Sequence, residues 1–492
     1  MTQGKILLPL VSFTIPLVLG NLFQLTYNAA DSVIVGKYVG EQALAAVGTS
    51  TPIMNIAILL ISGMCMGASV LMSSQYGAKD YDTLSKQIST TMLAGCGFSV
   101  VFSLLMLLLA TPVLRLIRVP ETAIPEAAVY LRIIFLGLIF TFIYNFLANT
   151  MRALGDSKTP LYFLVTSAFL NIFGDLFFVV VLRWGVAGSA IATVCSEGLC
   201  CLLCGIYIKK KIPLLCLGKK WWVFDKSLLG KTVSYGSTSA MQQVCLQLGK
   251  LIIQSVVNTQ GVAVMAAFTA VNRVDDFAYT PQQNIGHAMT TFLAQNKGAG
   301  HKERMKKGFQ TGLLIELVYS IGLFAAIWGL APQIMTLFAE DGDAQVVSLG
   351  ISYLHLISWM YILPGMTNGI QGFFRGIGDS KSPMYFIAVA CAANIGLDYL
   401  FIGVMGLDAA GAALGTTIAQ AVSVIVSLTV VIKKGTGIKL RKSDLRPKRH
   451  TMKNILKVGV PVALQDGFIQ ISFIAITIFA NQRGLNDAAA VG

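Results

Sequence analysis

A long internal repeat surrounds a short polar loop in this chain. Residues 152–193 read RALGDSKTPLYFLVTSAFLNIFGDLFFVVVLRWGVAGSAIAT, and residues 375–416 repeat them without a gap, with 17 of the 42 positions identical at an offset of 223. A fainter repeat at nearly the same offset pairs GASVLMSSQYGA, ending at Ala78, with HAMTTFLAQNKGA, ending at Ala299. The two halves of the chain therefore contain the same segments in the same order.

The segments on both sides of the polar loop are apolar and long. Of 492 residues, 55% are hydrophobic and only 12% are charged, whereas soluble proteins carry about 25% charged residues. A transmembrane helix needs about 20 mainly apolar residues. The runs are continuously apolar rather than alternating, which favours helices over barrel strands. Such stretches lie near residues 6–35, 43–75, 88–111, 127–149, 160–182, 186–208, 233–258, 264–295, 308–331, 346–374, 383–404, 409–433 and 455–480.

The repeat also determines the expected topology. Six helices per copy is an even number, so both copies keep the same orientation in the membrane. We therefore expect an all-α membrane protein of two six-helix bundles, related by a pseudo-two-fold axis along the membrane normal, plus an extra thirteenth span. The expected domains are an N-terminal lobe over residues 1–210, a C-terminal lobe over 211–433, and a basic linker with the extra helix over 434–492.

Basic residues gather in alternate connections between the spans. Lys79 and Lys86 follow the second span, Arg152 and Lys158 the fourth, and Lys209–Lys211 the sixth. Cytoplasmic loops are rich in Lys and Arg, so this pattern predicts a multi-pass protein of the cytoplasmic (inner) membrane with its N-terminus in the cytoplasm. The first apolar stretch is too long for a cleavable signal and is expected to remain as a span. The net charge of +14 thus indicates a membrane surface and not nucleic-acid binding.

Three acids lie inside apolar stretches. Asp31 stands in the first stretch and Asp175 in the fifth, four residues after Asn171. Glu197 stands in the sixth, four residues after Thr193. A carboxylate in hydrocarbon is energetically expensive, so such residues usually mark an ion or substrate path. A structural carboxylate that only bonds a neighbouring helix is the alternative.

Four motifs, in this order, resemble the multidrug and toxic compound extrusion (MATE) family. They are PLVLGNLFQLTYNAADSVIVGKYVGEQALAAVG, RALGDSKTP, NRVDDFAYTPQQNIG and GFFRGIGDSKSP. The resemblance covers about residues 1–433. It implies a V-shaped transporter that expels organic, often cationic, compounds in exchange for Na⁺ or H⁺. It also implies a cation site in the N-terminal lobe, made by Asp31, Asn171, Asp175 and Thr193.

The chemistry of these four residues supports a cation site. Asn171 and Asp175 are four positions apart and share one helix face. Carboxylate, amide and hydroxyl groups supply the oxygen ligands that hard cations prefer. Two neighbouring carboxylates in a low dielectric cannot both stay charged cheaply, so one holds a proton or recruits a cation. Either event links ion binding to conformation.

Other polar residues in the spans are candidates for the substrate path. Glu197 either extends the cation site or approaches the cytoplasmic end of its helix. Gln282 and Gln283 either line the cavity or hold helices together.

Two acids in the eighth span could form either a salt bridge or a substrate contact. Asp275 and Asp276 follow Arg273, so a local salt bridge is an equal alternative to a substrate contact. Lys250 in the seventh span is costly in lipid and should have an acidic partner.

The second half copies the first more closely than the family resemblance explains. Asn394, Asp398 and Thr416 stand at the repeat offset from three of the N-terminal site residues, and a MATE C-terminal lobe is not expected to carry that triad. A basic linker and a span beginning VGVPVALQDGF then follow Lys433, as they follow the first lobe. This order indicates that the chain from about Phe374 onward derives from helices 5 to 7 of a second transporter.

The sequence thus predicts a cation-coupled exporter and not an enzyme. It contains no GxxxxGK[ST] loop and no zinc or nucleophile motif, so no cofactor is expected and an Na⁺ or H⁺ gradient has to supply the energy. Expected partners are small organic substrates and the lipid bilayer, with no nucleic acid, and the chain is expected to be a monomer. Two alternatives stay open: a flippase for lipid-linked precursors, which would need a basic cavity, and a recombinant fusion that inserts but does not transport.

Overall fold

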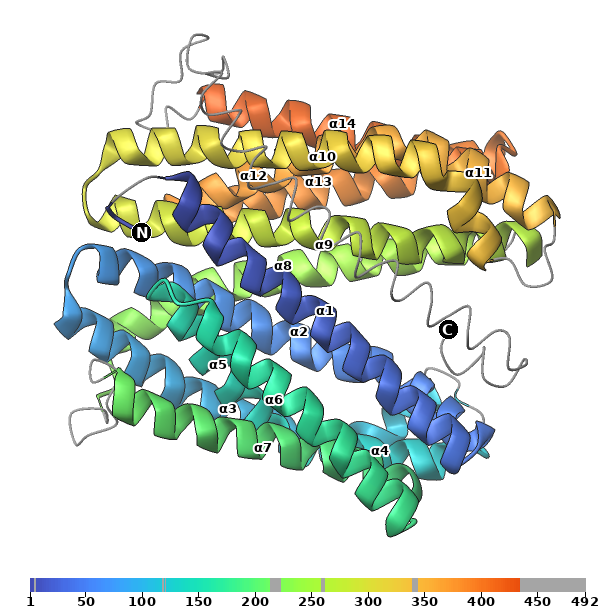
Figure 1. The fold of residues 1–492 in the computed structure, drawn as a ribbon, viewed down its shortest axis with the longest axis horizontal. Helices are drawn as coiled ribbons and strands as arrows, with labels where there is room; N and C mark the ends of the chain where they lie inside the picture. Colours follow the sequence, from blue (N-terminus) through green and yellow to red (C-terminus); the bar gives the residue numbers. More distant parts are fainter. Residues whose placement is uncertain are drawn as a thin grey trace. The chain divides into compact units, whose positions relative to one another are not determined.

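The chain is helical throughout the part that the structure describes. The computed structural model describes residues 1–3, 6–116, 119, 121–212, 223–257, 262–338 and 344–433, and these contain helices and turns but no strand. The predicted all-α fold is therefore confirmed (Figure 1). The thirteenth span predicted near residues 455–480 lies outside the described residues.

Short turns join the helices in sequence order. The first half contains α1 (Leu7–Tyr38), α2 (Glu41–Gly77), α3 (Tyr81–Leu116), α4 (Ile124–Leu136), α5 (Leu138–Ala153), α6 (Lys158–Asp175), the π-helix η1 (Leu176–Val181) and α7 (Gly185–Lys211). The second half contains α8 (Lys226–Val257), α9 (Val262–Gly298), α10 (Lys302–Phe338), α11 (Ala344–Ser358), the 3₁₀-helix η6 (Trp359–Tyr361), α12 (Ile362–Gly376), α13 (Lys381–Asp398), the π-helix η7 (Tyr399–Val404) and α14 (Asp408–Lys433).

The helix lengths agree with the spans predicted up to residue 433. Within the described part, eight helices are long and apolar enough to cross a membrane. The count is nine if α4 and α5, which meet at 47°, form one broken span. Helices α1, α8 and α9 have 32, 32 and 37 residues, which exceeds the roughly 20 residues that a crossing needs. The chain is thus a multi-pass membrane protein.

The described residues form two compact units. The N-terminal unit contains residues 19–240, and the C-terminal unit contains residues 1–18 and 241–433. Both boundaries fall inside continuous helices, α1 and α8, whereas the sequence pattern placed the lobe boundary in the basic stretch near residue 211.

Aromatic side chains form much of the core of the N-terminal unit. Phe135, Phe142 and Phe146, on α4 and α5, are at most 3% exposed and pack with residues of α2 and α3. Helices α6 and α7 pack against each other along their length. This pairing brings together the two helices that carry Asn171, Asp175 and Thr193.

The C-terminal unit has a similar aromatic core. Phe309 of α10 lies with its ring centroid 4.6 Å from that of Phe373 on α12. Phe374 and Phe386 pack edge to face beside them. Helices α13 and α14 pair in this unit as α6 and α7 do in the other.

The sequence repeat is also a repeat of local structure. Helices α6 and α13 both have 18 residues and end at Asp175 and Asp398, and a six-residue π-helix follows each. Each π-helix closes with a hydrogen bond to the carbonyl five residues earlier, 2.9 Å long, whose donors are the N–H groups of Leu182 and Met405. Single π-helical turns are rare and frequently lie at functional sites.

The polar loop before each of these helices has the same turn chemistry. Gly155 and Gly378 have φ of 95° and 85°, in the left-handed region that glycine adopts without strain. The aspartate that follows each glycine accepts an N–H of the first helical turn: Asp156 Oδ1 accepts the Thr159 N–H and Asp379 Oδ1 accepts the Ser382 N–H, both over 3.0 Å. The GDSK sequence thus specifies the same helix start twice.

Candidate functional site

Two carboxyl groups come together in the N-terminal unit. Asp31 lies on α1, and Asp175 is the last residue of α6. Their side chains are close enough to share a hydrogen bond when one of them holds a proton. Ser189 on α7 donates its hydroxyl hydrogen to Asp31 Oδ1 over 2.6 Å. Asp31 therefore faces α6 and α7.

Asn171 and Thr193 join the same cluster. Asn171 precedes Asp175 by one turn of α6, and its Nδ2 donates to Thr193 Oγ1 on α7 over 3.2 Å. Asn171 is 2% exposed and Asp175 is 0% exposed. The structure thus brings together the four residues that the family resemblance indicated.

Several oxygens of this cluster lack a hydrogen-bond donor among the described residues. They are Asn171 Oδ1 and both carboxylate oxygens of Asp175. A buried polar group without a partner costs about 1–3 kcal/mol, and a charged one costs more. A proton or a cation bound to these oxygens would therefore stabilise the cluster. All of the available ligand atoms are oxygens, which suits a hard cation such as Na⁺.

Glu197 has a partner of its own. It lies one turn after Thr193 on α7, and Thr141 on α5 donates its hydroxyl hydrogen to Glu197 Oε2 over 2.5 Å. No hydrogen bond within the described part joins Glu197 to Asn171 or Asp175. Glu197 therefore connects α7 to α5 and lies beside the cluster rather than in it.

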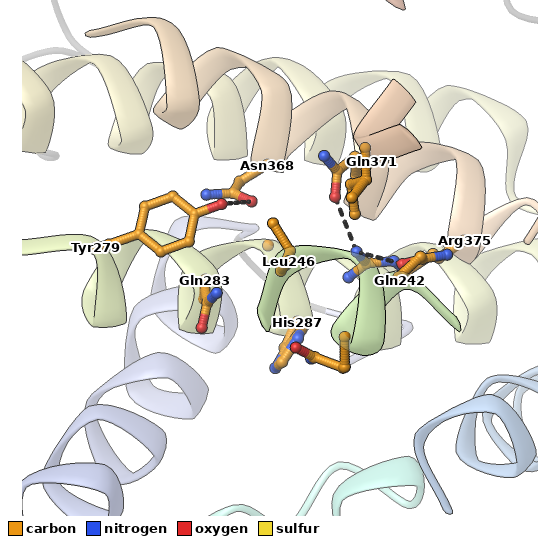
Figure 2. A pocket seen from close by; sticks show the side chains of 11 residues that line it. Gln242, Leu246, Tyr279, Gln283, His287, Asn368, Gln371 and Arg375 are labelled. Carbon is orange, nitrogen blue, oxygen red and sulfur yellow. Dashed lines mark hydrogen bonds between the residues drawn. The ribbon is translucent and has the colours of Figure 1, made fainter. Parts of the chain in front are cut away.

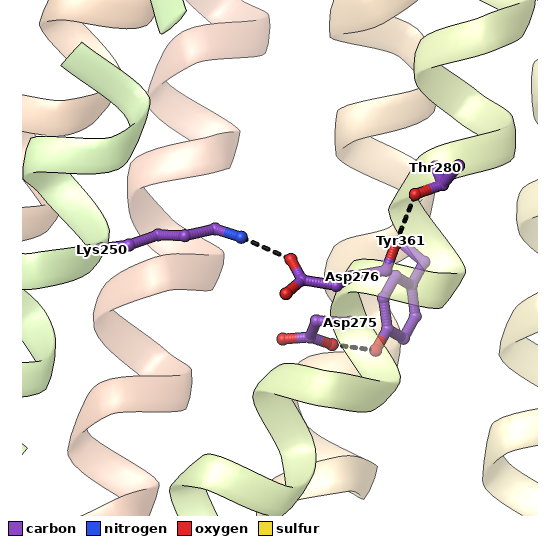
Figure 3. A network of polar contacts seen from close by, with 5 residues as sticks. All are labelled: Lys250, Asp275, Asp276, Thr280 and Tyr361. Atoms are coloured by element: carbon purple, nitrogen blue, oxygen red, sulfur yellow. Dashed lines mark hydrogen bonds and ion pairs between the residues drawn. The ribbon is translucent and has the colours of Figure 1, made fainter. Parts of the chain in front are cut away.

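Lys250 on α8 pairs with an acid on α9, as Figure 3 shows. Its Nζ lies 2.5 Å from Asp276 Oδ1, so the expected acidic partner of Lys250 is confirmed. The neighbouring Asp275 instead accepts a hydrogen bond from the Tyr361 hydroxyl. The Arg273 side chain, the other partner considered for these acids, lies outside the described residues.

Gln282 and Gln283 on α9 have different surroundings. Gln282 is 0% exposed, and its Nε2 donates to Ser320 Oγ over 2.9 Å and to the Tyr361 carbonyl over 2.8 Å. It therefore holds α9 against its neighbours. Gln283 lines a small polar pocket within the C-terminal unit (Figure 2).

Polar side chains from several helices line this pocket. Arg375 Nη2 donates to Gln371 Oε1 over 2.9 Å and to Gln242 Oε1 over 3.0 Å. The Tyr279 hydroxyl donates to Asn368 Oδ1 over 3.3 Å. Arg375 brings a positive charge to the pocket, and none of the described lining residues is acidic. The lining residues come from distant parts of the sequence, so no local spacing could have indicated the pocket.

A further buried acid, Glu316 on α10, had no spacing pattern to point to it. It is 0% exposed, and neither carboxylate oxygen has a donor among the described residues. A Cβ placed on Gly365 of α12 would lie 3.5 Å from Glu316 Oε2, so this acid lies between the two helices. The signal that singled out Asp31, one acid in an apolar stretch, could also have found Glu316.

Relatives by sequence agree with this architecture. The MatE family model matches residues 16–177 and 239–400, two segments at the offset of 223 residues that relates the internal repeat. The probable multidrug resistance protein YpnP of Bacillus subtilis (strain 168) is 32% identical over 380 residues, covering 77% of this chain and 84% of that protein. The multidrug export protein MepA of Staphylococcus aureus (strain MW2) is 19% identical over 422 residues, covering 86% and 92%.

Solved structures agree in fold. A MOP superfamily transporter from Pyrococcus furiosus matches with a TM-score of 0.81 at 22% identity, covering 89% of this chain and 98% of its own. An outward-facing multidrug resistance MATE family transporter matches with the same TM-score, identity and coverage. The family model matches more than half of this chain. The chain therefore belongs to the MatE family, whose members are membrane transporters and not enzymes.

Proposed function

We propose that this chain exports small organic, often cationic, compounds across the cytoplasmic membrane in exchange for Na⁺ or H⁺. The observation that carries the proposal is the cluster of Asp31, Asn171, Asp175 and Thr193, with its buried oxygens that lack donors. With two carboxyl groups, the site is neutral only when it holds two positive charges, either two protons or one proton and one Na⁺. The ion can therefore favour one conformation of the transporter over another.

The relatives support the substrate class and the environment. YpnP and MepA carry the names of a multidrug resistance protein and a multidrug export protein. The basic connections support a cytoplasmic N-terminus in the cytoplasmic membrane. We further propose that the chain acts as a monomer, because the N-terminal unit and the C-terminal unit each have a hydrophobic core of their own.

Efflux of a cationic dye such as ethidium tests the coupling. Asp31→Asn and Asp175→Asn keep the side-chain volume but remove the charge, so each is expected to reduce ion-driven efflux to the level of cells without the protein. Asp82→Asn is the matched control, because that side chain is 84% exposed at the start of α3. Undiminished efflux by a well-inserted Asp175→Asn protein would refute the site.

Reconstituted vesicles separate the coupling ions. An inward Na⁺ gradient at constant pH and an inward H⁺ gradient without Na⁺ are applied in turn, and the gradient that drives dye transport identifies the ion. A wild-type protein that inserts but responds to neither gradient would favour the non-transporting fusion.

One observation favours a second candidate, the flippase for lipid-linked precursors. The pocket in Figure 2 contains Arg375 and no acidic residue in its described lining, so it suits an anionic group better than a cation. Arg375→Gln distinguishes the two functions. It is expected to spare dye efflux if cationic compounds are the substrates, and to abolish movement of a pyrophosphate-linked lipid if the flippase is correct.

A further inference from the structure

Residues of the C-terminal unit reproduce the geometry of the candidate cation site. Asn394 and Asp398 stand one turn apart on α13, and Asn394 Nδ2 donates to Thr416 Oγ1 on α14 over 3.3 Å. The equivalent bond in the N-terminal unit measures 3.2 Å. Here Asn394 Nδ2 also donates to Asp398 Oδ2 over 3.0 Å. A π-helix follows the aspartate in both units.

The carboxyl group of Asp398 is buried and only partly bonded. The residue is 1% exposed, and Oδ1 has no donor among the described residues. None of the ion pairs within the described part includes Asp398. Burying a carboxylate without a compensating charge is strongly unfavourable. The position therefore requires a positive charge at Oδ1 whenever Asp398 is ionised.

Gly415 on α14 makes room for this oxygen. A Cβ at position 415 would overlap Asp398 Oδ1. The equivalent position in the N-terminal unit, 223 residues earlier, is Ala192. Gly415 is not among the residues of positive φ, so its backbone conformation does not require glycine. The absence of a side chain instead lets Asp398 Oδ1 lie directly against the backbone of α14.

We propose that Asn394, Asp398 and Thr416 form a second site, which binds one Na⁺ ion. Asp398 Oδ1 and the Thr416 hydroxyl oxygen would be ligands. A half-turn of the Asn394 amide would bring its carbonyl oxygen to the place that Nδ2 now takes. All three are hard oxygen donors, which match a small monovalent cation.

The second site differs from the first in its charge. The N-terminal cluster contains two carboxyl groups, Asp31 and Asp175, whereas the offset that pairs Gly40 with Gly261 puts Ile252 at the position of Asp31. One carboxylate and one Na⁺ form a neutral complex without any change in protonation. The inference thus goes beyond the proposed function and does not depend on it.

Binding of radioactive Na⁺ to the full-length chain in lipid nanodiscs tests the second site. The pH is held constant, and choline replaces Na⁺ in the controls. Saturable binding is expected to remain in Asp175→Asn protein and to be lost when Asp398→Asn is added. Na⁺ binding that Asp398→Asn leaves unchanged in both the wild-type and the Asp175→Asn background would overturn the proposal.

The same measurement separates this proposal from the coupling site. If Asp175→Asn binds as much Na⁺ as the wild type while Asp398→Asn lowers the binding, the second site stands and the N-terminal Na⁺ site fails.

Milder variants keep the test decisive if Asp398→Asn does not fold. In the Asp175→Asn background, Thr416→Val removes the hydroxyl at nearly constant shape and is expected to lose Na⁺ binding, whereas Thr416→Ser is expected to retain it. Gly415→Ala is expected to lose Na⁺ binding through its clash with Asp398. Its matched control is Gly396→Ala, whose Cβ would meet nothing within 4 Å. Na⁺ binding at the level of Asp175→Asn alone, when Thr416→Val or Gly415→Ala is added and the protein folds, would overturn the site.

Discussion

Close contact between α2 and α8 gives a direct test of packing in the N-terminal unit. Gly63 and Gly67 on α2 form a G-x-x-x-G pair that faces Ala240 and Gly236 on α8. Small residues at this spacing let helix backbones approach closely. A Cβ added at Gly67 would lie 2.5 Å from the backbone nitrogen of Gly236 and 2.6 Å from its Cα. Both are main-chain atoms, so no side-chain rotation can relieve the overlap.

Gly67→Ala is therefore expected to separate the two helices. Ordinary contact begins at 3.4 Å, so the helices must move apart by about 0.8–0.9 Å, the difference between 3.4 Å and the 2.5–2.6 Å distances. A gap of about 0.5–1 Å removes a quarter to a half of the dispersion energy of each contact across it. Overpacking of this kind costs about 1–3 kcal/mol, and we expect the unfolding free energy to fall by that amount.

Thermal unfolding of the purified protein in detergent measures the effect. Gly97→Ala on α3 is the matched control, because its Cβ would meet nothing within 4 Å. That control should unfold at or above the wild-type temperature, since alanine favours a helix over glycine by about 1 kcal/mol. A Gly67→Ala protein that is as stable as Gly97→Ala would refute the close approach of α2 and α8.

Glu316→Gln is expected to keep or raise the thermal midpoint, because the amide removes a charge from a site without a donor. A clear fall would show that the carboxyl group has a partner. Asp156→Ala should lower the unfolding free energy by about 1 kcal/mol through the lost bond to the Thr159 N–H, whereas Asp156→Asn should retain most of it. Equal stability of those two variants would contradict this role. Asp80 lies between α2 and α3, outside the spans, and hydrogen bonds from the Thr83 hydroxyl and N–H hold its pKa below the usual value. Its stabilising effect is present above the pKa of the unfolded chain and is lost as the pH falls through the folded pKa. The difference in midpoint between wild type and Asp80→Asn should therefore shrink in acid, and a constant difference from neutral pH to below about pH 3 would argue against it.

Helix positions could be predicted because continuous apolar runs reflect lipid exposure directly. The span predicted at residues 160–182, for example, appears as α6 and η1, Lys158 to Val181. The bend at Gly137 and the two π-helices could not be predicted in this way. An apolar composition indicates which segments avoid water. It does not indicate whether an N–H group bonds the carbonyl four or five residues earlier, which is what distinguishes an α-helix from a π-helix.

The acids of the candidate site could be predicted from the sequence in the same way, but the residues that donate hydrogen bonds to them could not. Asp31 and Asp175 stand out because acids are rare in apolar runs. The hydroxyl groups that bond the acids, such as Ser189 for Asp31 and Thr141 for Glu197, are common within the spans. Only tertiary packing determines which of them meets a carboxylate.

Each π-helix shifts the angular phase of its span. A single residue turns an α-helix by about 100°, so the wider turn of η1 changes the direction in which all later side chains of the span point relative to Asp175. If the six residues Leu176–Val181 were α-helical without any change in their number, the end of the span, including Arg183, would be rotated by about that angle. The same holds for Tyr399–Val404 after Asp398. The backbone hydrogen-bond pattern of these two turns, more than the identity of their side chains, thus sets the direction in which the later side chains of each span point.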